Sequence, residues 1–224
     1  KKKKNIVTQL QKYNVASVRP EIVDPETTKI LLTSNIKFDE KATAKTSDTL
    51  KSEVLTTLTN YNTNTLSQFD GVFRYSKLTG LIDGTDSSIL SNITTLKIRK
   101  DFTPTLSSST RYDVYFRNAL FNPHSGHNAA AGGILESSGF KISGDSSTVF
   151  FLDDDGQGNV RRYSFSGATR VYANETQGTI NYETGAITIT SLNVLSVENI
   201  RGSVSTKIEL TVVPNSNDVV PVRD

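Results

Sequence analysis

"KILLTSNIKFDEKATAKTSDTLKSEVLTTLTNY", residues 29–61, changes its hydrophobic period half way along. Its first ten residues alternate in the manner of a strand with one buried face, formed by Ile30, Leu32, Ser34, Ile36 and Phe38. From residue 50 onward, apolar residues recur at helical spacing and predict a single apolar stripe, formed by Leu50, Val54, Leu58 and Tyr61. A helix that packs its stripe on a small sheet is typical of an α+β fold.

Polar residues mark both ends of the predicted helix. Ser47 or Asp48 can cap its start, because a side-chain oxygen there accepts a hydrogen bond from an otherwise unpaired amide. Asn62 and Asn64 are expected to end it, since asparagine tolerates the left-handed backbone conformation.

Three more elements complete the first part of the chain. A short helix is predicted to begin near Ser76 and to stop at Asp83-Gly84, with apolar positions at Leu78, Leu81 and Ile82. The stretch NITTLKIRKDF then alternates as a strand does, with one side formed by Leu96, Ile98 and Phe102. A strand is also predicted at residues 15–23, where Pro20 indicates the edge of a sheet.

The chain changes character near Thr103-Pro104-Thr105. Strand and helix patterns mix before this point, and only strand patterns follow it. Ser107-Ser108-Ser109 is expected to form a short flexible joint. We therefore expect a small α/β sandwich module at residues 1–105 and an all-β, sandwich-like domain at residues 106–224.

The second part contains several short strand patterns separated by turns, which is typical of a sandwich or an elongated sheet. RYDVYF alternates through Tyr112, Val114 and Phe116. SVSTKIELTVV alternates through Val204, Thr206, Ile208, Leu210 and Val212. GTINYETGAITIT predicts a hairpin in which Gly185 supplies an unusual backbone angle at the turn.

Composition excludes several classes of protein. With 25 basic and 23 acidic residues, the formal net charge of +2 is too balanced to indicate nucleic acid or a membrane surface as a partner. The absence of cysteine excludes disulfide and thiolate chemistry. Ser and Thr make up nearly a quarter of the chain, which favours extended structure over a helical enzyme core. Because methionine is absent, we expect the chain to be a piece of a longer protein or a processed product.

The run YNTNTLSQFDGVFRYSKLTGLIDGTDSSILSN, residues 61–92, resembles one known family. It is similar to the baseplate wedge subunit of T-even-like contractile-tailed phages, a member of the baseplate J-like group. The matching features are Tyr61, Ser76-Lys77-Leu78, Ile82-Asp83 and Ser88-Ile89-Leu90-Ser91-Asn92. VDPETTKILLTSNIKFD and GTINYETGAITI also match, so the likeness extends from about Val18 to Ile189.

This resemblance implies a structural role in the C-terminal part of a longer protein. In the family, copies join other wedge subunits and form a ring around the central hub, and the ring rearranges when the sheath contracts. For this chain the resemblance implies self-association as a homodimer or ring, with other baseplate wedge proteins as partners. It also implies assembly in the host cytoplasm, a final location in the virion tail baseplate, no catalytic residues and no cofactor.

The run FFLDDDGQGNVRRYSF, residues 150–165, contains residue types found in calcium-binding loops and is therefore a candidate metal site. Calcium loops place oxygen ligands at alternate positions and end in a glutamate, whereas these aspartates are consecutive and arginines follow them. We expect a hairpin turn with solvated acids and with glycines at positive φ. The alternative is a weak cation site that uses Asp153 and Asp155 together with backbone carbonyls.

Two further groups of residues are candidates for an interface. His124 and His127, the only histidines, lie in a segment where Pro123 and Gly126 disfavour a helix that would let them share a metal. We expect a long mobile loop without chemistry of its own, or one that orders only against a partner. The second group lies between the two predicted helices and is rich in residue types found at binding hot spots: Phe69, Phe73, Arg74 and Tyr75. The alternative is that Phe73 and Tyr75 cap the small core.

No enzyme motif is present. The chain has no G-x-S-x-G elbow, no cysteine nucleophile and no phosphate-binding G-x-x-x-x-G-K-[ST] loop. Two hypotheses remain. The preferred one is a ring-forming structural protein of the virion; the rival is a carbohydrate- or receptor-binding β-module whose site combines the acidic turn with the histidine loop.

Overall fold

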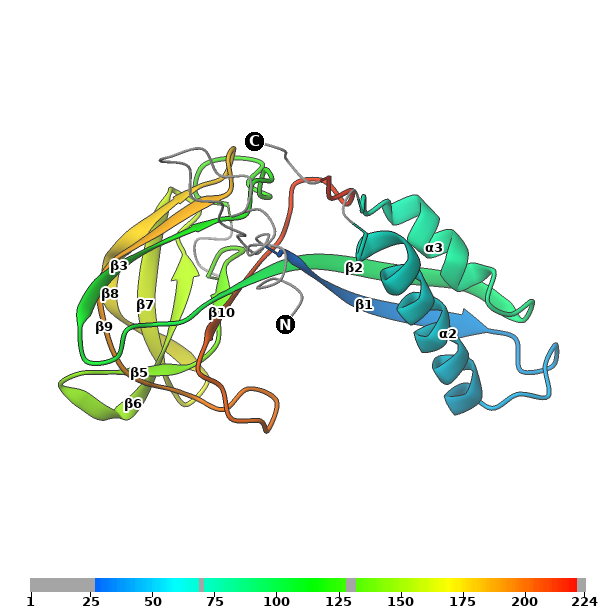
Figure 1. Cartoon of the computed structure of the whole chain (residues 1–224), viewed down its shortest axis with the longest axis horizontal. Helices are drawn as coiled ribbons and strands as arrows, with labels where there is room; N and C mark the ends of the chain where they lie inside the picture. Colours follow the sequence, from blue (N-terminus) through cyan, green and yellow to red (C-terminus); the bar gives the residue numbers. More distant parts are fainter. Residues whose placement is uncertain (1–26, 69–70, 128–131, 221–224) are drawn as a thin grey trace, which may run out of the picture.

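A computed structural model describes residues 27–68, 71–127 and 132–220 (Figure 1). The predicted strand at residues 15–23 and the interface candidate Phe69 lie outside this part of the chain. Figure 1 shows two parts: helices over a long strand pair on the right, and a curved β structure on the left. The predicted α+β class is therefore confirmed, with strands dominating the second part.

The first sheet has four strands in the order β1-β2-β10-β4. Their bounds are Lys29–Phe38 for β1, Ile89–Phe102 for β2, Ile208–Val212 for β10 and Glu136–Ser137 for β4. Two helices, α2 (Ser47–Tyr61) and α3 (Tyr75–Asp83), follow β1 in the chain. Leu96 and Ile98 of β2 share one hydrophobic cluster with buried residues of both helices: Val54, Tyr61, Leu78 and Ile82.

The period change within residues 29–61 correctly predicted β1 and α2, and Asn62 is the C-cap of α2 as expected, but the predicted N-cap at Ser47 or Asp48 is wrong. Its cap is Thr46, whose side-chain oxygen accepts from the Thr49 amide at 3.3 Å. At the other end Asn62 keeps right-handed helical angles, and the chain continues through a π-helical turn, η1 (Asn62–Leu66). Asparagine tolerates the left-handed conformation without requiring it.

The second part is built from long antiparallel strands that close on themselves. Pairings run from β9 to β5, β6, β7, β8 and back to β9, which makes a five-stranded antiparallel barrel, and β3 (Ser109–Tyr115) also pairs with β9. The bounds are Phe140–Ile142 for β5, Asp145–Asp154 for β6, Asn159–Ser166 for β7, Thr169–Asn181 for β8 and Ala186–Val197 for β9. Where a sandwich or an elongated sheet was expected, β9 closes the sheet by pairing with β8 through residues 186–189 and with β5 through residues 194–197. Register shifts in the β5–β6 and β7–β8 pairings accompany this curvature, as bulges do in bent strands.

Strand β10 connects the two parts. The alternating pattern at residues 204–212 was assigned to the second domain, but Ile208–Val212 pairs with Phe102–Ile98 of β2 in the first sheet. Val204, 87% exposed, precedes the strand. Buried residues of the helices, the first sheet and the barrel form one continuous cluster. The domain boundary at residue 105 stays a prediction, and the pairing of β10 with β2 crosses it.

The predicted joint at Ser107-Ser108-Ser109 is tied to the barrel. The Ser107 amide donates to the Val194 carbonyl at 2.7 Å, and the Thr105 amide donates to the Tyr112 hydroxyl at 2.9 Å. Ser107 has a φ of 54°, so the chain turns sharply there and β3 returns onto β9. These hydrogen bonds restrain the segment that was expected to be flexible.

Replacing Leu210 with alanine tests the shared core. Leu210 is fully buried in β10, between β2 and β4. We expect Leu210→Ala to lower the free energy of unfolding by about 2–5 kcal/mol, because it removes buried methyl groups and leaves a cavity. The neighbouring control, Thr211→Ala, is expected to cost less than about 1 kcal/mol. Urea unfolding followed by circular dichroism measures both, and equal stabilities of the two variants would contradict a shared core.

Candidate functional site

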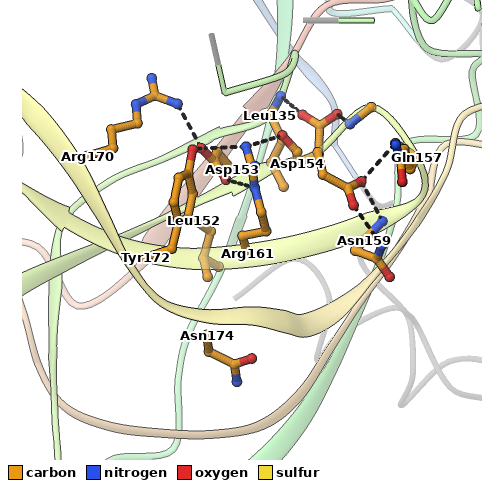
Figure 2. Close-up of polar contacts among 12 residues, drawn as sticks. Leu135, Leu152, Asp153, Asp154, Gln157, Asn159, Arg161, Arg170, Tyr172 and Asn174 are labelled. Atoms are coloured by element: carbon orange, nitrogen blue, oxygen red, sulfur yellow. Dashed lines mark hydrogen bonds and ion pairs between the residues drawn. The ribbon is translucent and has the colours of Figure 1, made fainter. Parts of the chain in front are cut away.

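The acidic run lies at the end of the β6–β7 hairpin, which was predicted correctly. Asp153 pairs with Arg161 across the hairpin, and Gly156 and Gly158 have φ values of 72° and 109°. The prediction of solvated acids is wrong for two of the three: Asp153 is fully buried and Asp154 is 1% exposed. These two carboxylates are therefore held inside the protein, and Figure 2 shows their partners.

Asp153 is enclosed by two arginines and a tyrosine (Figure 2). Arg161 binds both carboxylate oxygens, at 2.9 and 3.2 Å, and Arg170 reaches Oδ2 at 2.7 Å. The hydroxyl of Tyr172 donates to the same oxygen at 2.9 Å. Burial raises the pKa of Asp153, and the hydrogen bonds and charges of these partners oppose that rise. Because protein donors surround this buried carboxylate, Asp153 forms a structural ion pair and is not exposed to bind a ligand from solution.

Asp154 fixes a distant segment of the chain. Its Oδ1 accepts from the amides of Ile134 and Leu135, both at 2.7 Å. Its Oδ2 accepts from the Tyr182 hydroxyl at 2.6 Å and from the Gly156 amide at 3.2 Å. The carboxylate thus joins the chain before β4, its own hairpin and the turn that follows β8.

Two glycines let the chain pass close to these carboxylates. A Cβ on Gly133 would lie 2.0 Å from Oδ1 of Asp154, and one on Gly132 would lie 1.3 Å from Nη1 of Arg170. Both residues also have positive φ values, 88° for Gly132 and 67° for Gly133. This end of the segment expected to be a mobile loop is therefore shaped to pack on the acidic hairpin.

Asp155 stabilises the turn itself. Its carboxylate accepts from the amides of Gln157 and Asn159 at 2.8 and 2.9 Å, and from the Asn159 side chain at 2.6 Å. Burial acts to raise the pKa of Asp155, but these hydrogen bonds outweigh it and the pKa is lowered. All three aspartates are thus bound by protein donors. Within the described residues, no group of three or more His, Cys, Asp or Glu side chains could hold a metal.

Tyr182 belongs to this network in its neutral form. Burial, together with its hydrogen bond to Asp154, raises the pKa of Tyr182 well above its ordinary value. The phenol therefore stays protonated and can donate to the carboxylate at neutral pH. Sequence reasoning identified neither this role nor those of Arg170 and Tyr172. Only Arg161 could have been found, because it stands opposite Asp153 in a hairpin whose register the turn sets.

The interface candidates between the helices are divided between core and surface. Phe73 is 2% exposed, contacts the ring of Tyr61 and bridges to Val219, so its ring lies in the core. The hydroxyl of Tyr75 donates to the Thr94 carbonyl at 2.6 Å. Arg74 is exposed and pairs with Asp218 at 3.0 Å.

The histidine segment lies against the acidic turn. The Gly126 amide donates to the Gly156 carbonyl at 2.9 Å, and the Asn122 side chain donates to the same carbonyl at 3.3 Å. His124 and His127 are in contact, with their ring centroids 4.8 Å apart. The structure therefore brings together the two segments that the carbohydrate-binding hypothesis combined, but the aspartates point to protein donors.

The first module also contains an open groove. It has a volume of about 430 Å³ and lies between β1 and α2, lined mostly by apolar side chains that include Leu32, Ile36 and Leu55. In the described part of the chain, β1 ends the sheet order, so no strand pairs with its second edge. On β2, Leu90 and Ile93 are 62% and 69% exposed.

Across the ranges that the structure describes, no helix has the length and apolar content to span a membrane.

Replacing Asp154 with asparagine tests the carboxylate network. The amide group can accept through one oxygen only, so the donors at Gly156 and Tyr182 lose their partner. We expect Asp154→Asn to lower the free energy of unfolding by about 2–5 kcal/mol, since a buried unsatisfied donor costs about 1–3 kcal/mol. Glu183→Gln, at an exposed position in the turn between β8 and β9, should change it by less than about 0.5 kcal/mol. Urea unfolding compares the two, and an Asp154→Asn variant as stable as the parent would contradict this role.

Comparison with known proteins identifies the first module. Residues 29–101 match the family model of the baseplate structural protein gp6, C-terminal domain III. No curated protein matches the chain. The matched range begins with β1, contains both helices and ends one residue before β2 does. The module of residues 29–101 is therefore similar to a domain of a phage baseplate structural protein, a family whose role is structural and not enzymatic.

Proposed function

We propose that this chain is an assembly element that self-associates and joins baseplate wedges into a ring around the central hub. In this proposal its interfaces with neighbouring copies and other wedge proteins repack when the sheath contracts. The observation that carries the proposal is an edge of β1 that no strand covers within the described residues, beside the apolar groove on α2.

An open strand edge offers a row of backbone donors and acceptors to another chain. A partner strand that adds to β1 would form those backbone hydrogen bonds. Every second side chain of the partner could then enter the neighbouring groove, which would make the binding specific. Leu55 on α2 is 54% exposed and lines that groove. This combination of an edge and an adjacent apolar groove supports binding of an extended segment from a neighbouring subunit.

The shared core supports a particular kind of rearrangement. Because β10 and β4 come from beyond residue 105 and complete the first sheet, the two parts of the chain are held together by strand pairing. We therefore expect sheath contraction to change contacts between chains and to leave the shared sheet of this chain intact.

The rival function receives less support from the site. A carbohydrate- or receptor-binding site was expected to use the acidic turn, yet protein donors bind all three aspartates. Binding of the chain to a glycan array, with no self-association, would favour the rival.

A substitution in the groove tests the proposal. Leu55→Lys places a charge where an apolar contact is expected. Because Leu55 is 54% exposed, the substitution should leave the fold intact, so weaker association would not be due to unfolding. We expect self-association to weaken at least about tenfold, as truncating an interface residue that contributes more than about 1.4 kcal/mol would do. Sedimentation velocity over a range of concentrations measures the effect.

The matched control is Val204→Lys, which changes a residue 87% exposed on the connection between β9 and β10. This variant should associate as the parent does. A parent chain that stays monomeric at every concentration, or equal weakening by both substitutions, would overturn the proposed role of the groove.

A further inference from the structure

We propose that His124 and His127 together bind a divalent transition-metal ion. The turn at residues 124–127 places Nδ1 of His127 3.1 Å from Nε2 of His124. Two ligands that each lie about 2.0–2.1 Å from one metal ion are about 2.8–3.4 Å apart in octahedral or tetrahedral geometry. The two nitrogens are therefore already at the separation that a shared ion requires.

The tautomer of His124 is suited to binding. Its Nδ1 lies 3.2 Å from the Ser125 carbonyl oxygen, which can only accept, so Nδ1 carries the proton. Nε2 therefore keeps its lone pair, which accepts the hydrogen bond from His127 and can bind an ion instead after a modest rotation of the ring. A histidine that binds metal commonly donates its other N–H to a backbone carbonyl, which fixes the orientation of the ring.

His127 needs one proton exchange. Its Nδ1–H donates to Nε2 of His124 when no metal is bound. On binding, Nδ1 gives its proton to water and Nε2 takes one from water, so the ring stays neutral while its lone pair moves to Nδ1. Both imidazoles then bind the ion as neutral ligands, and water fills the remaining positions.

The turn is held in place by the barrel. The His127 amide donates to the His124 carbonyl at 3.0 Å, and the Gly126 amide donates to the Gly156 carbonyl. Phe121 contacts the His127 ring edge to face, with centroids 5.4 Å apart. A Cβ on Gly156 would lie 2.3 Å from the His127 carbonyl oxygen. This close packing orients the pair without the helix that sequence reasoning required for a shared metal.

Imidazole ligands suit Zn²⁺, Ni²⁺ and Cu²⁺, with Cu²⁺ expected to bind most tightly. Since the chain has only two histidines and no cysteine, binding through imidazole in the untagged chain must use this pair. Isothermal titration with NiCl₂ and, separately, ZnCl₂ tests it directly. We expect saturable binding of one ion per chain, reversed by EDTA, and perturbation of both imidazole proton signals in the NMR spectrum.

His124→Ala and His127→Ala should each weaken binding at least about tenfold, the lower end of the loss that removing even an outer-shell partner causes. Gly156→Ala should also weaken it, because the added methyl group displaces the turn while both imidazoles remain. Ser125→Ala, which keeps the backbone carbonyl, is the matched control and should bind as the parent does. Absence of saturable binding, or unchanged binding in either histidine variant, would overturn the proposal.

Discussion

Strand β2 is the element on which the architecture depends, because it pairs along both edges. One edge carries β1 and the other carries β10, and Ile98 and Arg99 have partners on both sides. An ion-pair cluster also joins β2 to β10: Arg99 is 9% exposed and pairs with Asp101 on β2 and with Glu209 on β10. Ion pairs in such a position need several partners to offset the loss of hydration. The result is a sheet that neither part of the chain completes alone.

The carboxylate network performs a similar task within the barrel. Asp153 links β6 with β7 and β8, and Asp154 links β6 with the chain that leads into β4. Since β4 pairs with β10, the acidic hairpin is connected through hydrogen bonds to the first sheet. Continuous pairing of this kind resists separation of the two parts of the chain. Strand β1 stands at the other end of that sheet order from β4, and the apolar groove lies between β1 and α2.

Local patterns predicted what depends on local geometry. The alternation in β1 and the helical stripe of α2 were sufficient because each has a single buried face. The cap was missed by one residue, since Thr46, Ser47 and Asp48 all carry suitable oxygens and only the backbone angles select among them. Strand β10 was recognised as a strand but assigned to the wrong sheet, because alternation does not encode which partner a strand pairs with.

The site was less accessible to sequence reasoning. Consecutive aspartates before glycines indicated a turn, and the turn is present. Their burial depends on Arg170, Tyr172 and Tyr182, which come from later in the chain and have no fixed spacing from the hairpin. The histidine pair was dismissed because no helix was expected, whereas a tight turn brings the rings equally close.

Native-state hydrogen exchange tests most directly whether β2 and β10 join the two parts into one cooperative unit. If they do, the amides of β10 and those of β9 in the barrel exchange only through global unfolding, with the same free energy and the same dependence on denaturant. If the β2 and β10 amides exchange through a separate opening of much lower free energy while the barrel stays protected, the two parts are independent and the account is contradicted.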